Sequence, residues 1–243
     1  MGKAVVVFSG GQDSTTVLGM ALQAGNEVVA LSFDYGQKHA VELEQAKKIA
    51  AALNVEHRII DVKAFGQLVG GKSALVDQSQ SVNDQSPLAH MPAGIPASFV
   101  PNRNALFLTI AHGFAQTIGA DSVWTGVCET DYSGYPDCRH EFILSLQKAL
   151  NVGYLTNIQI VTPLMWATKA GTFQLAEEAG VLDLVLNESH TCYNGVRGAS
   201  NGIDGLLPAV DSIHDWGHGC GVCPACQLRE KGWNEYQTDK GRG

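Results

Sequence analysis

The sequence has little charge, and it is short of basic residues. Only 16% of its 243 residues are charged, below the ~25% usual for soluble domains. The 16 Lys and Arg are outnumbered by 24 Asp and Glu, which gives a net charge of −8. This balance argues against a protein whose main partner is the phosphate backbone of nucleic acids. The chain has no long block of like charges and 45% of its residues are apolar, which excludes a disordered chain as well.

Long apolar stretches are absent too. No run approaches the roughly 18 apolar residues of a membrane span, and the first residues lack the cationic and apolar segments of a signal peptide. We therefore expect a cytoplasmic protein with no membrane partner, in which thiols stay reduced. The chain has no internal repeat. Its 27 glycines, about 11% against a usual ~7%, indicate many tight turns or close approaches of the backbone to a ligand.

Strand and helix patterns alternate along the chain. The expected strands are short apolar runs of the kind buried in parallel sheets: residues 4–8, 28–33, 57–62 and 122–127. The expected helices carry apolar residues at helical spacing: residues 14–23, 41–53, 104–118, 140–150 and 169–178. This alternation implies right-handed crossovers and predicts a doubly wound, Rossmann-like α/β fold with a parallel sheet.

Two stretches are too irregular for this pattern. Residues 66–100 are dominated by Gly, Ser, Gln, Asn and Pro, and a loop of that length is typically functional or disordered. Residues 193–219 are irregular and rich in glycine. We expect an α/β domain over residues 1–185 and a C-terminal segment over residues 186–243 that packs on it.

A motif with two glycines lies between the first expected strand and its helix: Ser9, Gly10, Gly11, Gln12, Asp13 and Ser14. The glycines let the backbone turn sharply and direct N–H groups toward an anion, and the helix adds its N-terminal dipole. Asp13 would repel a bare phosphate, so we expect it to cap the loop or to hold Mg²⁺. The motif is neither a Walker loop nor a G-x-G-x-x-G turn. An ordinary strand–turn–helix connection with a serine cap is the alternative.

Four of the six cysteines form a second motif. Cys220, Cys223 and Cys226 have C-x-x-C-x-x-C spacing, and Cys192 precedes them by 28 positions. Three thiolates on one loop and a fourth from elsewhere predict a closed, structural Zn²⁺ site. An iron–sulfur cluster and a redox-active C-x-x-C pair are the alternatives. Disulfides are disfavoured in a cytoplasmic chain.

Three nearby histidines are alternative fourth ligands: His190, His214 and His218. Soft thiolate sites favour a fourth sulfur, so Cys192 is the predicted ligand. The two remaining cysteines, Cys128 and Cys138, are expected to be small buried side chains.

Residues 130–139 combine two Tyr rings, two carboxylates and an Arg around Gly and Pro. Such a loop could stack a flat heterocycle and hydrogen-bond its edges, although a polar surface turn has the same composition. Arg103 precedes one expected helix, and Lys169 begins another. Both cations therefore lie at helix starts.

The loop at residues 9–14 matches the S-G-G-x-D-S signature of the PP-loop ATP pyrophosphatases, and D-Y-G-Q at 34–37 resembles their second signature. Four more motifs accompany them: V-P-x-R-N at 100–104, D-Y-S-G-Y-P-D-C-R at 131–139, T-P-L-M at 162–165 and C-Y-N-G at 192–195. With these motifs the chain resembles the 7-cyano-7-deazaguanine synthase family over nearly its whole length. One departure is the stretch from residue 196 to 219, which is longer than the usual link between the first two zinc cysteines.

The resemblance implies an ATP-dependent ligase that converts 7-carboxy-7-deazaguanine and ammonia to the 7-nitrile. The reaction would pass through an adenylated carboxylate and an amide, on the route to queuosine. The family also suggests a homodimer that uses ATP, Mg²⁺ and one structural Zn²⁺ per chain.

The same resemblance assigns residues to roles. The expected ATP site is Phe8, Ser9, Gly10, Gly11, Gln12, Asp13, Ser14, Thr15 and Asp34, with Asp34 near the adenine. The catalytic candidates are Asp13, Lys169 and Arg103. The candidates for holding the deazaguanine and its carboxylate are Arg103, Asp131, Tyr132, Tyr135, Asp137 and Arg139. The metal ligands would be Cys192, Cys220, Cys223 and Cys226.

Two rival functions remain. A tRNA-modifying PP-loop enzyme, such as a thiolase or ligase, would need a basic surface that the net charge does not offer globally. A non-catalytic nucleotide-binding module would explain the loop and the cysteines but would give residues 131–139 no purpose. Three C-terminal aromatics could form a subunit interface or pack locally: Trp216, Trp233 and Tyr236.

Overall fold

A five-stranded parallel sheet forms the centre of the molecule. The computed structural model describes residues 2–37, 41–69, 73, 75–76, 95–96, 98–130, 135–197 and 213–242. The strands of the sheet are β1 (Lys3–Val7), β2 (Glu27–Asp34), β3 (Glu56–Asp61), β4 (Ser122–Trp124) and β5 (Gln159–Val161). They lie in the order β3-β2-β1-β4-β5 and every neighbouring pair is parallel. The predicted doubly wound sheet is confirmed.

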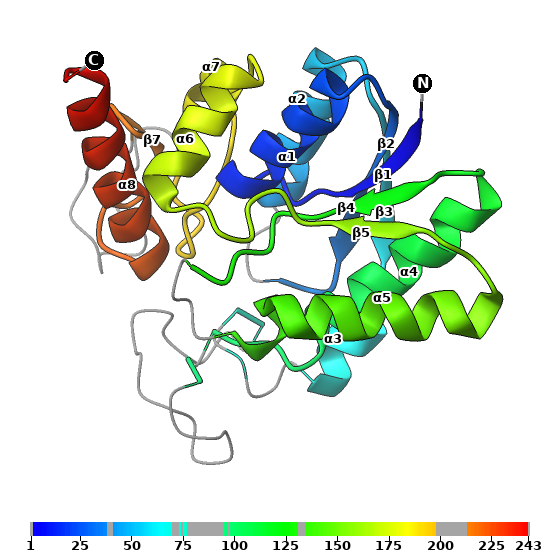
Figure 1. The fold of residues 1–243 in the computed structure, drawn as a ribbon. Coiled ribbons are helices and arrows are strands. Elements are labelled where there is room, and N and C mark those ends of the chain that lie inside the picture. Colours follow the sequence, from blue (N-terminus) through cyan, green and yellow to red (C-terminus); the bar gives the residue numbers. More distant parts are fainter. Residues whose placement is uncertain are drawn as a thin grey trace.

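Helices cover both faces of this sheet (Figure 1). On one face lie α1 (Gln12–Gln23) and α2 (Val41–Ala52), with α6 (Lys169–Glu178) and α7 (Leu182–Asn187) beside α1. On the other lie α3 (Lys63–Val69), α4 (Arg103–Thr117) and α5 (His140–Tyr154). Because both faces are covered, the interiors of β1 and β2 are buried at every position and do not alternate between buried and exposed.

Successive side chains of β1 enter two different cores, as the pleat of a strand requires. Val5 packs in the core that α4 and α5 share, and Val6 packs in the core that α1 and α2 share. Both side chains have no exposed surface. The central strand is therefore fixed from both sides, and the loop that follows it leaves from a rigid base.

The strand order reverses between β1 and β4, where doubly wound sheets bind their ligands. The carboxyl end of β1 leads into residues 9–14, and the end of β4 leads into residues 125–128. The two segments nearly touch: a Cβ atom on Gly126 would lie 3.2 Å from the Cβ of Asp13. The sheet thus places the predicted phosphate-binding motif at its ligand-binding edge.

The C-terminal helix α8 (Pro224–Lys240) packs against α6 at one side of the molecule (Figure 1). A two-stranded antiparallel sheet, β6 (Ile213–His214) and β7 (Gly217–His218), precedes it. Trp216 and Tyr236 are 3% and 5% exposed, and Trp233 contacts Phe173 at 5.1 Å between ring centroids. These aromatics pack within the chain, which accounts for them without an interface.

Several boundaries differ from the sequence prediction. Helix α1 begins at Gln12 rather than at residue 14, β4 ends at Trp124, and α5 continues to Tyr154. The stretch 66–100 was predicted as a loop, but α3 occupies its first residues. Strand β5, helix α7 and helix α8 were not predicted, because they are short or largely polar. Among the described helices, none is long and apolar enough to cross a membrane.

Candidate functional site

A cavity of about 320 Å³ opens at the carboxyl ends of β1, β2 and β4. Parts of the chain that are far apart in sequence form its wall. The predicted site residues that line it include most of the loop at residues 9–14, together with Arg103, Tyr135, Lys169 and Cys192.

The phosphate loop, residues 9–14, makes a turn that only glycine can make at its second position. Gly10 has φ +78°, in the left-handed region that other residues avoid. A Cβ atom there would lie 2.8 Å from both the Ala46 nitrogen and the Glu42 carbonyl oxygen of α2. The loop is therefore pressed against α2.

Hydroxyl groups hold the turn from inside. Ser14 Oγ accepts a hydrogen bond from the Ser9 N–H at 3.2 Å and donates to the Gly11 carbonyl oxygen at 3.2 Å. The Gly11 N–H in turn donates to Ser9 Oγ at 3.4 Å. Gly11 is the cap residue of α1 and, as a glycine, offers no side chain to cap the helix. The serine cap of the alternative interpretation is therefore not found, and the role of Asp13 in capping the loop or holding Mg²⁺ stays a prediction.

Asp13 pairs instead with Lys169. The Lys169 Nζ lies 2.9 Å from Oδ1 and 2.7 Å from Oδ2 of Asp13. Lys169 is the first residue of α6, whose cap residue Thr168 accepts the Gly171 N–H at 3.1 Å. The Lys169 side chain is only 10% exposed. Two residues predicted separately as catalytic candidates thus form one ion pair beside the phosphate loop.

The other residues predicted to bind ATP divide into two groups. Phe8 and Gln12 line the cavity. Thr15 is fully buried behind the loop. Asp34 is not among the lining residues; its carboxylate pairs with Lys63 at 2.8 Å and accepts the Gly36 N–H at 3.1 Å. Its place near the adenine stays a prediction.

Arg103 enters the cavity from the start of α4. Its Nη1 donates to the Tyr35 hydroxyl at 3.4 Å, and its guanidinium carbon lies 5.8 Å from the centre of the Tyr35 ring. Burial is the main influence on Tyr35 and raises the pKa of its hydroxyl, which favours the neutral phenol. Arg103 is thus a cation on a partly apolar wall, suited to a carboxylate or a phosphate.

Residues 131–139 enter the site only in part. Tyr135 lines the cavity, and its hydroxyl contacts Ser98 Oγ at 2.6 Å. Asp137 does not line the cavity. Its carboxylate accepts a hydrogen bond from the Asn104 N–H at 3.2 Å, one of the N–H groups in the first turn of α4 that have no partner within the helix. Burial raises the pKa of Asp137, although this hydrogen bond opposes the effect. Arg139 is exposed and lies outside the cavity. Asp131 and Tyr132 fall outside the described residues.

Aromatic rings form one side of the cavity. Phe33 and Phe107 stack at 4.1 Å with 6° between their planes, and Tyr35 lies 5.8 Å from Phe107. Tyr193 lines the same cavity, and burial raises the pKa of its hydroxyl. Flat apolar surfaces of this kind suit a planar heterocycle.

Glu42 on α2 is an unpredicted carboxylate in the cavity wall. Burial raises its pKa to about 7, while the Arg103 cation opposes the shift. A carboxylic acid that titrates near neutral pH can gain or lose a proton under cellular conditions. Glu42 therefore adds a titratable group to the site.

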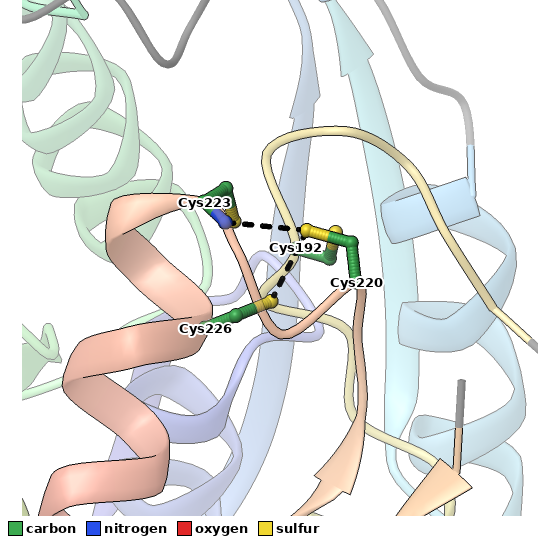
Figure 2. Close-up of side chains that lie close together, drawn as sticks. All are labelled: Cys192, Cys220, Cys223 and Cys226. Carbon is green, nitrogen blue, oxygen red and sulfur yellow. Dashed lines mark hydrogen bonds between the residues drawn. The ribbon is translucent and has the colours of Figure 1, made fainter. Parts of the chain in front are cut away.

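Four buried cysteines form the four-cysteine cluster: Cys192, Cys220, Cys223 and Cys226. Their sulfurs all lie within 4.8 Å of one another, and each residue is at most 3% exposed. Figure 2 shows the side chains pointing toward one another from the loop after α7, the turn after β7 and the start of α8. The Asn194 amide donates to Cys220 Sγ at 3.3 Å. The predicted grouping of Cys192 with the C-x-x-C-x-x-C motif is confirmed, and these sulfurs suit one metal ion.

The three histidines considered as alternative ligands make other contacts. Each places its Nε2 near a backbone carbonyl oxygen. The His190 Nε2 lies 3.1 Å from the oxygen of Cys192, and the His214 Nε2 lies 3.3 Å from the oxygen of Gly219. The His218 Nε2 lies 3.0 Å from the oxygen of Asn187. Among the described residues, none of them belongs to the four-cysteine cluster. Cys128 and Cys138 also lie outside it; both are half-buried and line the cavity, and Cys138 packs against the core as well.

Sequence reasoning missed several cavity residues: Tyr35, Glu42, Phe107, Thr191 and Tyr193. Tyr35 and Tyr193 do lie inside quoted motifs, next to Asp34 and Cys192, so their neighbours were a usable signal. Glu42, Phe107 and Thr191 carry no local signal, since folding alone brings their elements to the cavity.

The chain matches the family model for the queuosine biosynthesis protein QueC over residues 3–237. It is 51% identical over 235 residues to a 7-cyano-7-deazaguanine synthase from Wolinella succinogenes, covering 97% of this chain and 94% of that protein. A 7-cyano-7-deazaguanine synthase from Helicobacter pylori strain HPAG1 is 47% identical, covering 96% and 95%. In fold, the chain is similar to a 4-thiouridine synthetase that was solved in complex with RNA and with bound ATP. The TM-score is 0.52 and the sequence identity is 16%, and the match covers 96% of this chain and 53% of that one. The chain belongs to the QueC family of queuosine biosynthesis proteins.

Proposed function

We propose that this chain is a 7-cyano-7-deazaguanine synthase, which uses ATP and ammonia to convert 7-carboxy-7-deazaguanine to the 7-nitrile. Family membership supports the activity. The observation that carries it in the molecule is one cavity that joins the phosphate loop to Arg103 and an aromatic wall. A nucleotide and a flat acid can meet there.

The chemistry needs an activated carboxylate, because a free carboxylate is a poor electrophile. A substrate carboxylate oxygen attacks the α-phosphorus of ATP, and the adenylated carboxylate forms as the leaving phosphates depart. Ammonia then attacks the carbonyl carbon, and release of AMP leaves the amide. Activation of the amide oxygen by a second nucleotide allows that oxygen to leave, and loss of the two N–H protons completes the nitrile.

The phosphate loop and the Asp13–Lys169 pair would serve the nucleotide. The loop N–H groups and the start of α1 favour negative charge, and Lys169 adds a cation 2.7 Å from Asp13. Both would offset the charge that develops on the phosphates during transfer. Asp13 supplies a carboxylate beside the loop, the ligand type that Mg²⁺ takes together with phosphates. When bound, Mg²⁺ would neutralise phosphate charge.

Arg103 and the tyrosines would hold the deazaguanine. The planar guanidinium suits the substrate carboxylate, and the rings of Tyr35, Phe107 and Tyr193 give a flat surface for the bicyclic base. Tyr135 lies at the same cavity. For Asp137 and Arg139 we expect indirect effects, because neither lines the cavity. Asp131 and Tyr132 remain predicted substrate contacts.

The four-cysteine cluster would hold one structural Zn²⁺. Four sulfurs about 2.3 Å from one ion lie about 3.8 Å apart in a tetrahedron, and the Cys220 and Cys226 sulfurs are 3.9 Å apart. A cluster of several iron ions would need its sulfurs further apart than a single ion does. The four ligands leave no open position, so the ion would stabilise the fold rather than react.

Metal analysis of the purified chain tests the zinc proposal. We expect about one zinc per chain, the content of a single four-cysteine site, and Cys192→Ser should lower it and the melting temperature together. Cys128→Ser, outside the cluster, is the matched control and should keep the metal. Visible absorption of an iron–sulfur chromophore in the native protein would overturn the proposal.

A tRNA-modifying activity is the competing function, and one assay separates the two. The zinc-loaded chain is incubated with ATP, Mg²⁺, ammonium and 7-carboxy-7-deazaguanine, with and without tRNA. We expect the nitrile, detected by mass spectrometry, in equal amounts in both mixtures. No nitrile from a fully metallated protein would overturn the proposed function. The same preparation, run on a size-exclusion column with light scattering, tests the homodimer that the family suggests.

A further inference from the structure

Residues 189–192 lie between the four-cysteine cluster and the phosphate loop, and are hydrogen-bonded to the loop at two points. The His190 N–H donates to the Gly10 carbonyl oxygen at 2.9 Å. The Gln12 N–H donates to Thr191 Oγ1 at 3.3 Å. The next residue, Cys192, belongs to the cluster. One short segment therefore touches the proposed metal site and the proposed ATP site.

Arg229 of α8 holds this segment from behind. It has no exposed surface, and its three side-chain nitrogens donate four hydrogen bonds to neutral oxygens. Nε donates to the Trp216 oxygen at 2.8 Å, Nη2 to the Val185 oxygen at 2.6 Å, and Nη1 to Ser189 Oγ and Thr191 Oγ1 at 3.0 and 3.1 Å. In the described part of the chain it makes no ion pair. A buried guanidinium held this way is costly to move, because each donor would lose its partner.

Charged groups of both sites lie around Arg229, together with the Arg197 cation. Burial is the main influence on Arg229 and lowers its pKa to about 10. The negative groups that oppose this effect are Cys226 of the cluster and Asp13 of the phosphate loop. The cation is thus placed to interact with both sites at once.

Two hydroxyls that bind the same Arg229 nitrogen differ in what else they contact. Thr191 Oγ1 accepts from Arg229 and from Gln12, which uses both acceptor positions of a hydroxyl. Ser189 Oγ accepts from Arg229 but donates to the Val185 oxygen, away from the phosphate loop. Of these two hydroxyls, Thr191 connects the Arg229 cation to the phosphate loop and Ser189 does not. Ser189 is therefore a matched control for the loss of one hydrogen bond to Arg229.

Helix α8 also contacts the other side of the phosphate site. A Cβ atom on Gly232 would overlap the Cβ and backbone of Lys169, so the two helices touch there. Lys169 pairs with Asp13 at 2.7 Å. The helix that begins in the four-cysteine cluster therefore supports the phosphate loop through Thr191 and through Lys169.

We propose that Arg229 is a positioning residue that couples the metal cluster to the phosphate loop through Thr191, so that ATP and the metal each bind more tightly in the presence of the other. Such coupling is reciprocal by thermodynamic necessity. The inference rests on the proposed function only for the identity of the two ligands. It does not depend on the deazaguanine reaction.

ATP affinity of zinc-loaded variants, measured by titration calorimetry, tests the link at Thr191. We expect Thr191→Val to weaken ATP binding about five- to tenfold, the effect of about one lost hydrogen bond, and Thr191→Ser to restore it. Ser189→Ala should lower the melting temperature but keep the ATP affinity. The inference is overturned if Thr191→Val binds ATP within twofold of wild type, or if Ser189→Ala weakens it equally.

Zinc affinity, measured at equilibrium by competition with a colorimetric chelator, tests the reciprocal effect, and in the wild-type chain it needs no variant. ATP should tighten zinc binding about fivefold in wild type, a coupling in the usual range, and should have little effect in Thr191→Val. Equal zinc affinity with and without ATP in wild type would overturn the coupling while leaving the proposed synthase intact. A chain that binds no ATP at all would overturn both.

Discussion

Single residues in this site act in pairs that come from distant parts of the chain. Asp13 and Lys169 are 156 positions apart, yet their side chains meet at 2.7 Å beside the phosphate loop. Asp13 keeps 32% of its side chain exposed toward the cavity, while Lys169 keeps only 10%. Removing one member of such a pair leaves the other charge poorly compensated. The pair therefore links stability to the chemistry at the loop.

Replacement of Asp13 should separate these two effects. We expect Asp13→Ala to reduce turnover by about 100-fold or more, since the loop loses its carboxylate beside the phosphates. The fold should survive, at a cost of about 1–3 kcal/mol for the loss of the ion pair with Lys169. Asp183→Ala, in the first turn of α7 and outside the cavity, is the control. Near-normal activity of Asp13→Ala would contradict the assignment of the loop.

Glu42 should make stability depend on pH. Burial raises its pKa to about 7, so the folded chain binds its proton more tightly than the unfolded chain does. The free energy of unfolding should therefore fall as the pH rises from about 4.5 to 7, and then level off, by about 1–2 kcal/mol for a side chain that keeps some contact with water.

Urea unfolding of Glu42→Gln at several pH values isolates this contribution. Relative to the variant, wild type should lose stability over that interval, because glutamine does not titrate. Glu44→Gln, on the exposed side of the same helix with its carboxylate 2.6 Å from Lys47, controls for the loss of a charge. A constant difference between wild type and Glu42→Gln across the interval would show that this carboxyl group is not perturbed.

At the scale of elements, the phosphate loop depends on how closely α2 approaches β1 and α1. Gly10 has φ +78° and lies against the backbone of Ala46 and Glu42. A side chain at this position would strain the turn and push α2 away. The loop proposed to bind phosphate is thus shaped by a helix that contributes no residue to its motif.

Gly10→Ala tests this dependence, with Gly25→Ala as the matched control. Gly25 has a nearly identical φ of +79°, but a Cβ atom there would meet nothing within 4 Å. Gly25→Ala should cost about 1–2 kcal/mol for the left-handed backbone alone. Gly10→Ala should cost more and should also weaken ATP binding at least tenfold. Equal losses of stability and unchanged ATP affinity would show that the contact with α2 does not matter.

Elements were predictable from the sequence where a local pattern determines them. The apolar runs predicted β1, β2 and β3 to within a residue or so, and Lys169 was correctly placed at the start of α6. Helix α8 was missed because its sequence is largely polar, and its buried face is carried by residues such as Arg229 and Gly232. A buried arginine and a glycine give no apolar periodicity, although they make the contacts that support the site.

At the scale of the whole molecule, the sheet and the four-cysteine cluster bring segments from many parts of the sequence to one cavity. The motifs in the sequence predicted which residues matter, namely the phosphate loop, Arg103 and the cysteines. They could not predict Glu42 or Thr191, because only the completed fold brings α2 and residues 189–192 to the loop. Asp137 lies in a motif that predicted a substrate contact, but in the fold its carboxylate accepts a hydrogen bond from an N–H group at the start of α4.

The central claim is that this cavity joins a carboxylic acid to adenylate before nitrogen enters. The most direct measurement uses 7-carboxy-7-deazaguanine labelled with ¹⁸O in its carboxylate, with ATP, Mg²⁺, ammonium and the zinc-loaded chain. We expect the 7-nitrile together with AMP that carries one ¹⁸O atom, because the oxygen that attacks the α-phosphorus leaves with it. Nitrile formation with the label in inorganic phosphate instead of AMP, or no nitrile at all, would contradict adenylation of the carboxylate.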